Sequence, residues 1–159
     1  MTAATATGRT STMDLLGATP IAALPVRAWA RVDAGDAMWK VVAEMKAKGR
    51  GAVLVEENGA LVGIFTERDL VGRLDHGDVL WSHVVVRDVM TPHPTVIRPD
   101  DSLAEAIRRL VSGRRRHLPI VDDTGKPSGL LSIRDVLAFL ASRFPDEIAN
   151  LPPDPDHET

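Results

Sequence analysis

GLLSIRDV, at residues 129–136, is the stretch that decides the fold. It follows a turn-like DDTGKP segment and leads into an apolar run, a pattern that predicts a short strand followed by a helix. Ser132 and Asp135 have the spacing of a capping box, in which the hydroxyl and the carboxylate satisfy free N–H groups at the start of a helix. A similar stretch, GIFTERDL at residues 63–70, places Thr66 and Asp69 at the same spacing, which indicates an internal repeat.

The repeat extends over most of the chain. Few residues are identical between the two copies, but the apolar, turn and acidic positions keep the same register. The aligned pairs of segments are 21–32 with 86–97, 36–45 with 101–110, 52–59 with 117–125, and 63–70 with 129–136. Such a repeat predicts two similar units that pack on each other, because one unit alone buries little apolar surface.

In each copy, a short extended segment, 30–32 or 95–97, precedes a helix whose apolar residues recur at helical spacing on one face. These residues are Met38, Val41, Val42 and Met45 in the first copy, and Leu103, Ala106, Ile107, Leu110 and Val111 in the second. The periodicity predicts that this face is buried in both copies.

Two strands and a final helix complete each copy. The first pair of strands flanks Asn58 and Gly59, a strong hairpin signal. Ser102 and Glu105 predict a capping box at the start of the earlier helix of the second copy, and Gly113 predicts its end. The predicted fold is α+β, a mixed α/β arrangement of tandem β-α-β-β-α repeats.

The repeat boundaries divide the chain into five segments. They are a flexible tail at 1–19, repeat units at 20–74 and 86–143, a linker at 75–85, and a flexible acidic tail at 144–159. The first tail is rich in Thr and Ala, and the last is rich in Pro and acidic residues. Trp81 is expected to pin the linker to the body of the protein by packing.

The composition excludes several classes of protein. A net charge of −3 gives no global attraction to nucleic acid, and the lack of cysteine excludes disulfides and thiolate metal sites. No apolar run approaches the roughly 20 residues that cross a bilayer, and the N-terminus has no secretory h-region. We therefore expect a cytoplasmic protein without a membrane partner. The histidines lack the spacing of a metal site, so no metal is expected.

Taken together, these residues resemble the cystathionine-β-synthase (CBS) domain pair, or Bateman module. The resemblance rests on G-h-h-[ST]-x-x-D at 63–69 and 129–135, on HLPIVD at 117–122, and on VMTPHPTVIRPDDSLAEAI at 89–107. It covers roughly residues 20–141 and implies two units packed about a pseudo-twofold axis, with two clefts that bind AMP, ADP, ATP or S-adenosylmethionine. It also implies a homodimer, and a regulated enzyme or transporter as a partner.

The resemblance gives the paired motifs a second role. It implies that Asp69 and Asp135 accept hydrogen bonds from ribose hydroxyls, with Thr66 and Ser132 in support. The chemistry suits this role, because a cis-diol offers two adjacent donors to a carboxylate with two acceptors. Capping and ribose binding are compatible, since the cap can fix the rotamer that the ligand uses.

The resemblance also implies positions for the phosphate groups and the base. The expected phosphate-binding residues are Arg116, His117, Arg134 and its counterpart Arg68. The expected base-binding residues are Thr95, Pro119 and Ile120. The first copy has Gly51 and Ala52 where the second has Arg116 and His117, so the two clefts are expected to differ.

The main functional hypothesis is a non-catalytic regulatory module, an energy or metabolite sensor that binds an adenosyl ligand and requires no cofactor. The first alternative is a CBS-type interaction or dimerisation module that has lost its ligand, for which Trp39, off the apolar stripe, is a candidate contact. An enzyme is disfavoured because no nucleophile–base pair, phosphate loop or metal motif is present. Nucleic-acid binding through Arg114–Arg116 is disfavoured too, because a solvated edge explains a bare basic run.

Overall fold

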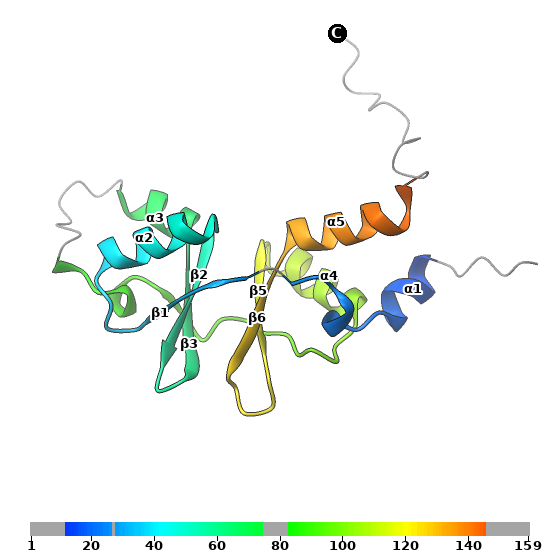
Figure 1. Cartoon of the computed structure of the whole chain (residues 1–159), viewed down its shortest axis with the longest axis horizontal. Coiled ribbons are helices and arrows are strands. Elements are labelled where there is room, and N and C mark those ends of the chain that lie inside the picture. Colours follow the sequence, from blue (N-terminus) through cyan, green and yellow to red (C-terminus); the bar gives the residue numbers. More distant parts are fainter. Residues whose placement is uncertain (1–11, 27, 75–82, 146–159) are drawn as a thin grey trace, which may run out of the picture.

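The computed structural model describes residues 12–26, 28–74 and 83–145, which form two halves side by side (Figure 1). The first half contains β1 (Ala30–Asp33), α2 (Met38–Lys48), β2 (Ala52–Glu57), β3 (Ala60–Thr66) and α3 (Glu67–Leu74). The second half contains α4 (Leu103–Ser112), β5 (His117–Val121), β6 (Pro127–Ser132) and α5 (Ile133–Arg143). The predicted mixed α/β fold with two repeated units is confirmed.

The two sheets differ in size. In the first half, β1 pairs parallel with β2, and β3 pairs antiparallel with β2 and with the short β4 (Thr91–Pro92). In the second half, β5 and β6 form an antiparallel pair, and Ile97 adds only an isolated parallel bridge to Ile120 where a strand was predicted. Pro94 and Pro99 flank that bridge, and since proline has no N–H they limit the ladder on both sides.

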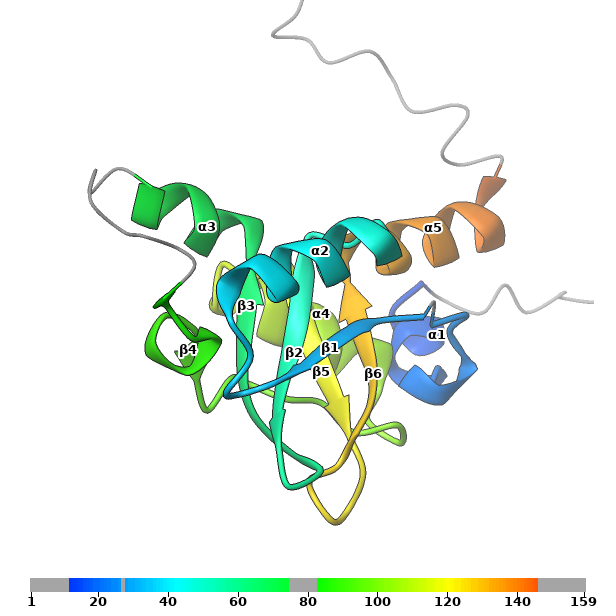
Figure 2. The same cartoon turned by 60° about the vertical axis from the view of Figure 1, so that its left-hand side comes forward.

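The hairpin turns have the geometry that their residues favour. Asn58 and Gly59 have φ values of 52° and 80°, the left-handed values that a two-residue hairpin turn requires. In the second hairpin, the Asp122 carboxylate accepts hydrogen bonds from the backbone N–H groups of Thr124 and Lys126. Both turns lie at the end of the molecule opposite α3 and α5 (Figure 2).

Each half completes its core with a segment from the other sequence repeat. Ile21 and Leu24, from the first repeat, are buried in the cluster that includes Leu103 and Val136 of the second half. In return, Val86, in the 3₁₀ turn Val86–Asp88 of the second repeat, is buried in the core of the first half. The exchange is therefore reciprocal, and the structural halves do not coincide with the sequence repeats.

Backbone hydrogen bonds fix both exchanged segments. The Ile21 N–H donates to the Asp101 carbonyl at 2.9 Å, and the Leu103 N–H donates to the Thr19 carbonyl at 2.8 Å. On the other side, the Val86 N–H donates to the Asp36 carbonyl at 2.9 Å. The helix α1 (Thr12–Ala18) lies beside α4, with Leu16 against the core, although a flexible tail was predicted there (Figures 1 and 2).

Most residues of the predicted apolar faces of α2 and α4 are buried, but Val111 is not. Met38, Val41 and Met45 are buried on α2. On α4, Leu103, Ala106 and Leu110 are buried, and the predicted core residue Val111 is 69% exposed. Val111 lies at the edge of the apolar stripe, beyond Ile107, which is itself only partly buried. The predicted position of Trp81 lies outside the described residues.

The end signals of α4 are only partly as predicted. Ser102 Oγ accepts from the Glu105 N–H at 3.2 Å, but the Glu105 carboxylate binds Arg108 and Arg109 instead of completing a capping box. These hydrogen bonds lower the pKa of Glu105 to about 2. Gly113, which was predicted to end the helix, has φ −91° and is not left-handed. The left-handed residue after the helix is the next one, Arg114, with φ 48°.

Candidate functional site

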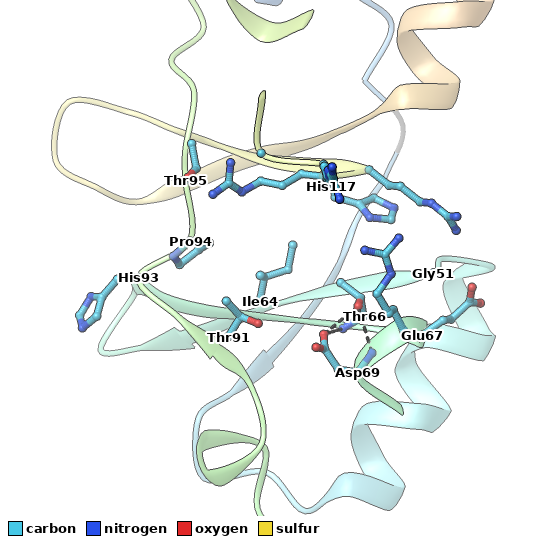
Figure 3. A pocket seen from close by; sticks show the side chains of 15 residues that line it. Gly51, Ile64, Thr66, Glu67, Asp69, Thr91, His93, Pro94, Thr95 and His117 are labelled. Atoms are coloured by element: carbon cyan, nitrogen blue, oxygen red, sulfur yellow. Dashed lines mark hydrogen bonds between the residues drawn. The ribbon is translucent and has the colours of Figure 1, made fainter. Parts of the chain in front are cut away.

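A cleft of about 320 Å³ lies between the two halves, and we call it the Asp69 cleft after the residue at its floor. Its floor comes from the junction of β3 and α3, one wall comes from the segment 91–95, and the opposite wall comes from residues 113–117 (Figure 3). The site is therefore built from both sequence repeats.

The floor carries the Thr66–Asp69 capping box. Asp69 Oδ2 accepts from the Thr66 N–H at 2.8 Å and from Thr66 Oγ1 at 2.7 Å, and Thr66 Oγ1 accepts from the Asp69 N–H at 3.3 Å. Within the described chain, Asp69 Oδ1 has no hydrogen-bond donor, and the side chain is half-buried (Figure 3). One carboxylate oxygen thus serves the helix cap, and the other is free to accept from a ligand.

Two threonine hydroxyls lie on the wall that segment 91–95 forms. Thr91 pairs with Ile64 in the short β4 ladder, and Thr95 follows farther along the wall. His93 between them has a left-handed φ of 47°, and its imidazole points away from the cleft (Figure 3). Thr91 was missed by the sequence analysis, because the pairing that places it at the cleft is between the two repeats.

The opposite wall is strongly basic. Arg114, Arg115 and Arg116 line it, and Arg68 lies at the floor. None of these four guanidinium groups has an ion-pair partner anywhere in the described residues. These four arginines outnumber the two carboxylates of the lining, Glu67 and Asp69, so the cleft has a net positive charge that favours an anionic ligand.

His117 completes this wall in a more buried position. Burial lowers the pKa of its imidazole below the ordinary value, and nearby Arg116 and Arg134 lower it further. The carboxylates of Asp135 and Glu67 oppose this shift without reversing it. His117 is thus a neutral hydrogen-bonding group at pH 7 that an approaching phosphate can help to protonate.

A second cleft of about 240 Å³, which we call the Ser132 cleft, lies at the start of α5. Trp29, Arg50, Ser132 and Arg134 line it. Its capping box matches the first, since Asp135 Oδ2 accepts from the Ser132 N–H at 2.9 Å and from Ser132 Oγ at 2.6 Å. Unlike Asp69, however, Asp135 is only 7% exposed and is not part of the cleft lining.

The structure divides the predicted ligand-binding residues between the two clefts. Thr66, Arg68, Asp69 and Thr95 line the Asp69 cleft, Ser132 and Arg134 line the Ser132 cleft, and Arg116 and His117 line both. Arg68 and Arg134, the mirror positions of the two motifs, therefore line different clefts.

Pro119 and Ile120 line neither cleft. Pro119 pairs with Leu130 in the β5–β6 ladder, and Ile120 lies in the hydrophobic core of the second half. Both faces of β5 are covered, so these side chains have no access to a ligand. The predicted base slot at Pro119 and Ile120 is therefore wrong.

The two glycines of the repeated motif have close neighbours that are side chains of the protein. Met90 fills the space where a Cβ on Gly63 would lie. A Cβ on Gly129 would lie 2.9 Å from Ile120 Cδ1 and 3.2 Å from Val26 Cγ1. The lack of a side chain at Gly63 and Gly129 is thus required by packing within the protein.

Comparison with known proteins gives the family directly. The model of the CBS domain matches residues 21–76 and 86–142. The chain belongs to the CBS domain family. It is a tandem CBS domain pair, and the Asp69 and Ser132 clefts lie between its two domains.

Solved CBS-domain proteins share this fold. CBSX2 of Arabidopsis thaliana, solved in complex with AMP, is 25% identical with a TM-score of 0.69, over 78% of this chain and 97% of that chain. A CBS-domain protein of Burkholderia ambifaria is 28% identical with a TM-score of 0.66, over 90% of this chain and 98% of that chain.

The chain also matches parts of longer proteins. The arabinose 5-phosphate isomerase of Pseudomonas aeruginosa is 36% identical over 105 residues, which are 65% of this chain and 32% of that protein. An uncharacterized protein of Methanopyrus kandleri is 34% identical over 99 residues, 62% of this chain and 50% of that protein. The chain thus spans half or less of the length of these curated relatives.

The described ranges contain neither a candidate metal site nor a candidate membrane-spanning helix. No three His, Cys, Asp or Glu side chains come together there in a group that could hold a metal ion. In the same ranges, none of the helices is both long and apolar enough to cross a membrane.

Proposed function

We propose that this CBS pair is a non-catalytic regulatory module that binds an adenine nucleotide in the Asp69 cleft. The observation that carries the proposal is Asp69 Oδ1, which no donor in the described residues reaches and which lies in the same cleft as four arginine side chains without an ion-pair partner in those residues. A ribose offers two hydroxyl donors to such a carboxylate, and a phosphate offers acceptors to guanidinium groups. The AMP complex of CBSX2 supports the same ligand class.

The nucleotide parts have separate places in this cleft. The ribose lies over Asp69, and the phosphate faces the wall formed by residues 113–117. The base lies against Ile64, within reach of the Thr91 and Thr95 hydroxyls, and replaces the slot that was predicted at Pro119 and Ile120. A ligand held in this way contacts both halves, so its binding can change the angle between them and thereby the affinity for a partner.

Thermal unfolding with AMP, ADP, ATP and S-adenosylmethionine, each added separately, tests the proposal. A ligand at 100 times its dissociation constant adds about 2.7 kcal/mol to the stability. For a domain pair of this size, that shift raises the midpoint by roughly 5–10 °C. If no adenosyl compound raises the midpoint at millimolar concentration, the proposal is rejected.

A second candidate function is dimerisation without a ligand, and exposed apolar side chains favour it. Val71 on α3 is 68% exposed, and Leu137 at the aligned position on α5 is 57% exposed. Both helices lie at the same end of the molecule (Figures 1 and 2). The double variant V71E/L137E is expected to convert a dimer to a monomer in analytical ultracentrifugation. An unchanged sedimentation coefficient would exclude this surface, and a nucleotide response that survives monomerisation would separate the two functions.

A further inference from the structure

The two clefts are adjacent and share part of their lining. Gly51, Glu67, Arg116 and His117 line both the Asp69 cleft and the Ser132 cleft, and we call these four residues the bridging strip. Two of its members are joined directly, because the Glu67 N–H donates to the Gly51 carbonyl at 3.0 Å. His117 is paired with Ser132 in the β5–β6 ladder.

Arg116 has a fixed backbone and a free side chain. Its carbonyl accepts from the Ile133 N–H at 2.9 Å, which ties it to the start of α5. The side chain is exposed and makes no ion pair with any described residue. A long side chain on a fixed base that borders two clefts can bind an anion in either, but one guanidinium cannot bind in both at once.

The other cations of the Ser132 cleft cannot replace Arg116 when it binds a phosphate in the Asp69 cleft. Without the bridging strip, the Ser132 cleft keeps only Arg50 and Arg134 as cations, and Arg50 Nε already donates to the Ala28 carbonyl at 2.9 Å. Glu67 borders both clefts and opposes an anion in each of them. A second phosphate group would therefore meet less positive charge and the repulsion of the first phosphate.

We infer that the bridging strip makes phosphate binding in the two clefts mutually exclusive. A phosphate group in one cleft engages Arg116 and His117 and weakens phosphate binding in the other. The chain then takes one phosphorylated ligand per copy, and a phosphate-bearing molecule in the Ser132 cleft antagonises the nucleotide in the Asp69 cleft. The part of the inference that concerns AMP rests on the proposed function, and the part that concerns phosphate does not.

Nuclear magnetic resonance of backbone amides can follow each cleft separately. Inorganic phosphate is titrated at constant ionic strength, with Thr91 and Thr95 as reporters of the Asp69 cleft and Leu130 and Ser132 as reporters of the Ser132 cleft. Without nucleotide, both sets of amides are expected to shift, with one equivalent of phosphate bound in total. With saturating AMP, the phosphate-induced shifts at Leu130 and Ser132 are expected to be lost, because Arg116 is already engaged by the AMP phosphate.

Two variants separate the shared arginine from its neighbours. In Arg116→Ala, phosphate binds more weakly to both clefts and AMP no longer changes the phosphate affinity at Leu130 and Ser132. Arg114→Ala is the matched control, because Arg114 lines only the Asp69 cleft, and this variant keeps the antagonism.

Several results would overturn the inference. They are an unchanged phosphate affinity at Leu130 and Ser132 in AMP-saturated protein, an antagonism that survives in Arg116→Ala, two independent equivalents of phosphate, or no phosphate-induced shift at all. If AMP itself does not bind, the proposed function fails, and the stoichiometry of inorganic phosphate still decides the inference.

Discussion

The Asp69 cleft and the Ser132 cleft each lie beside the same kind of capping box and share four lining residues, but only the Asp69 cleft includes the capping carboxylate in its lining. In both, one carboxylate oxygen accepts from the backbone N–H and the hydroxyl of the residue three positions earlier. Asp69 is half-buried with a free oxygen at a cleft, whereas Asp135 is 7% exposed and outside the cleft lining. The repeated motif is therefore a property of the fold, and the neighbours from the other repeat decide whether it can bind a ligand.

The difference between the two clefts is tested most strongly by neutralising Asp69 and Asp135 in turn. Asp69→Asn is expected to weaken AMP binding by about 100-fold, because two hydrogen bonds to the ribose lose their charged acceptor. Asp135→Asn is the matched control, and its effect on AMP binding is expected to stay within about threefold. Isothermal titration calorimetry measures both.

Both variants weaken a capping box, so each is expected to lose about 1 kcal/mol of stability in urea unfolding. Equal losses of AMP affinity in the two variants would show that the clefts are equivalent, and would contradict the claim that only Asp69 binds the ribose.

The glycines of the two motifs give the next largest expected effect. Gly63→Ala places a methyl group in the space that Met90 fills, and we expect a loss of about 2 kcal/mol. At Gly129→Ala the nearest atom, Ile120 Cδ1, would lie 2.9 Å from the new methyl group, farther than Met90 Sδ would lie from a methyl group on Gly63, so a smaller loss of about 1 kcal/mol is expected. Urea unfolding gives both values, and the double variant G63A/M90A tests the cause, since it should cost less than the sum of its single variants.

The ends of the first helices also differ between the halves. The helix α2 ends at Gly49 with φ 59°, whereas after α4 the left-handed residue is Arg114 with φ 48°. A side chain in this conformation costs about 1–2 kcal/mol, so Arg114→Gly is expected to raise the stability by about 0.5–1 kcal/mol after the entropy of glycine is subtracted. Arg115→Gly removes the same charge at a residue with negative φ and should not stabilise the protein. A stabilisation by both would point to charge repulsion as the cause.

The smallest expected effect concerns pH and His117. Because burial lowers the pKa of its imidazole in the folded protein, the unfolded chain binds a proton more readily, and stability falls as the pH falls below about 6.5. A bound phosphate favours the imidazolium, so AMP affinity should rise about threefold relative to His117→Gln from about pH 7.5 to about pH 5.5. Calorimetry at the two pH values measures this difference, and identical pH profiles for the two proteins would show that His117 does not contact the phosphate.

Much of the fold could be predicted because its signals are local. The hairpin at Asn58 and Gly59 and the two complete capping boxes each depend on residues close in sequence. The aligned register of the repeats then gave the order of the elements. Val111 was mispredicted because helical spacing defines the centre of a buried face better than its edge, where Val111 lies beyond the partly buried Ile107.

The site was harder to predict because its lining depends on contacts between the repeats. Thr66 and Asp69 were recognisable from their motif, and they lie at the Asp69 cleft. Thr91 was missed, since its place at the cleft comes from pairing with Ile64 in the other repeat. Pro119 was wrongly included because the sequence does not show that both faces of β5 are covered.

The reciprocal exchange of core segments has a consequence for dividing the protein. A chain cut between its sequence repeats would give two fragments, and each fragment would carry residues that belong to the hydrophobic core of the other. One fragment would carry Ile21 and Leu24 without Leu103 around them, and the other would carry Val86 without Met38 and Val41. Neither fragment could bury these apolar side chains alone, but the pair could recover every contact by reassociating. The molecule therefore offers a natural design for a split reporter, in which the return of fluorescence or activity from fused reporter halves reports that the two pieces have met.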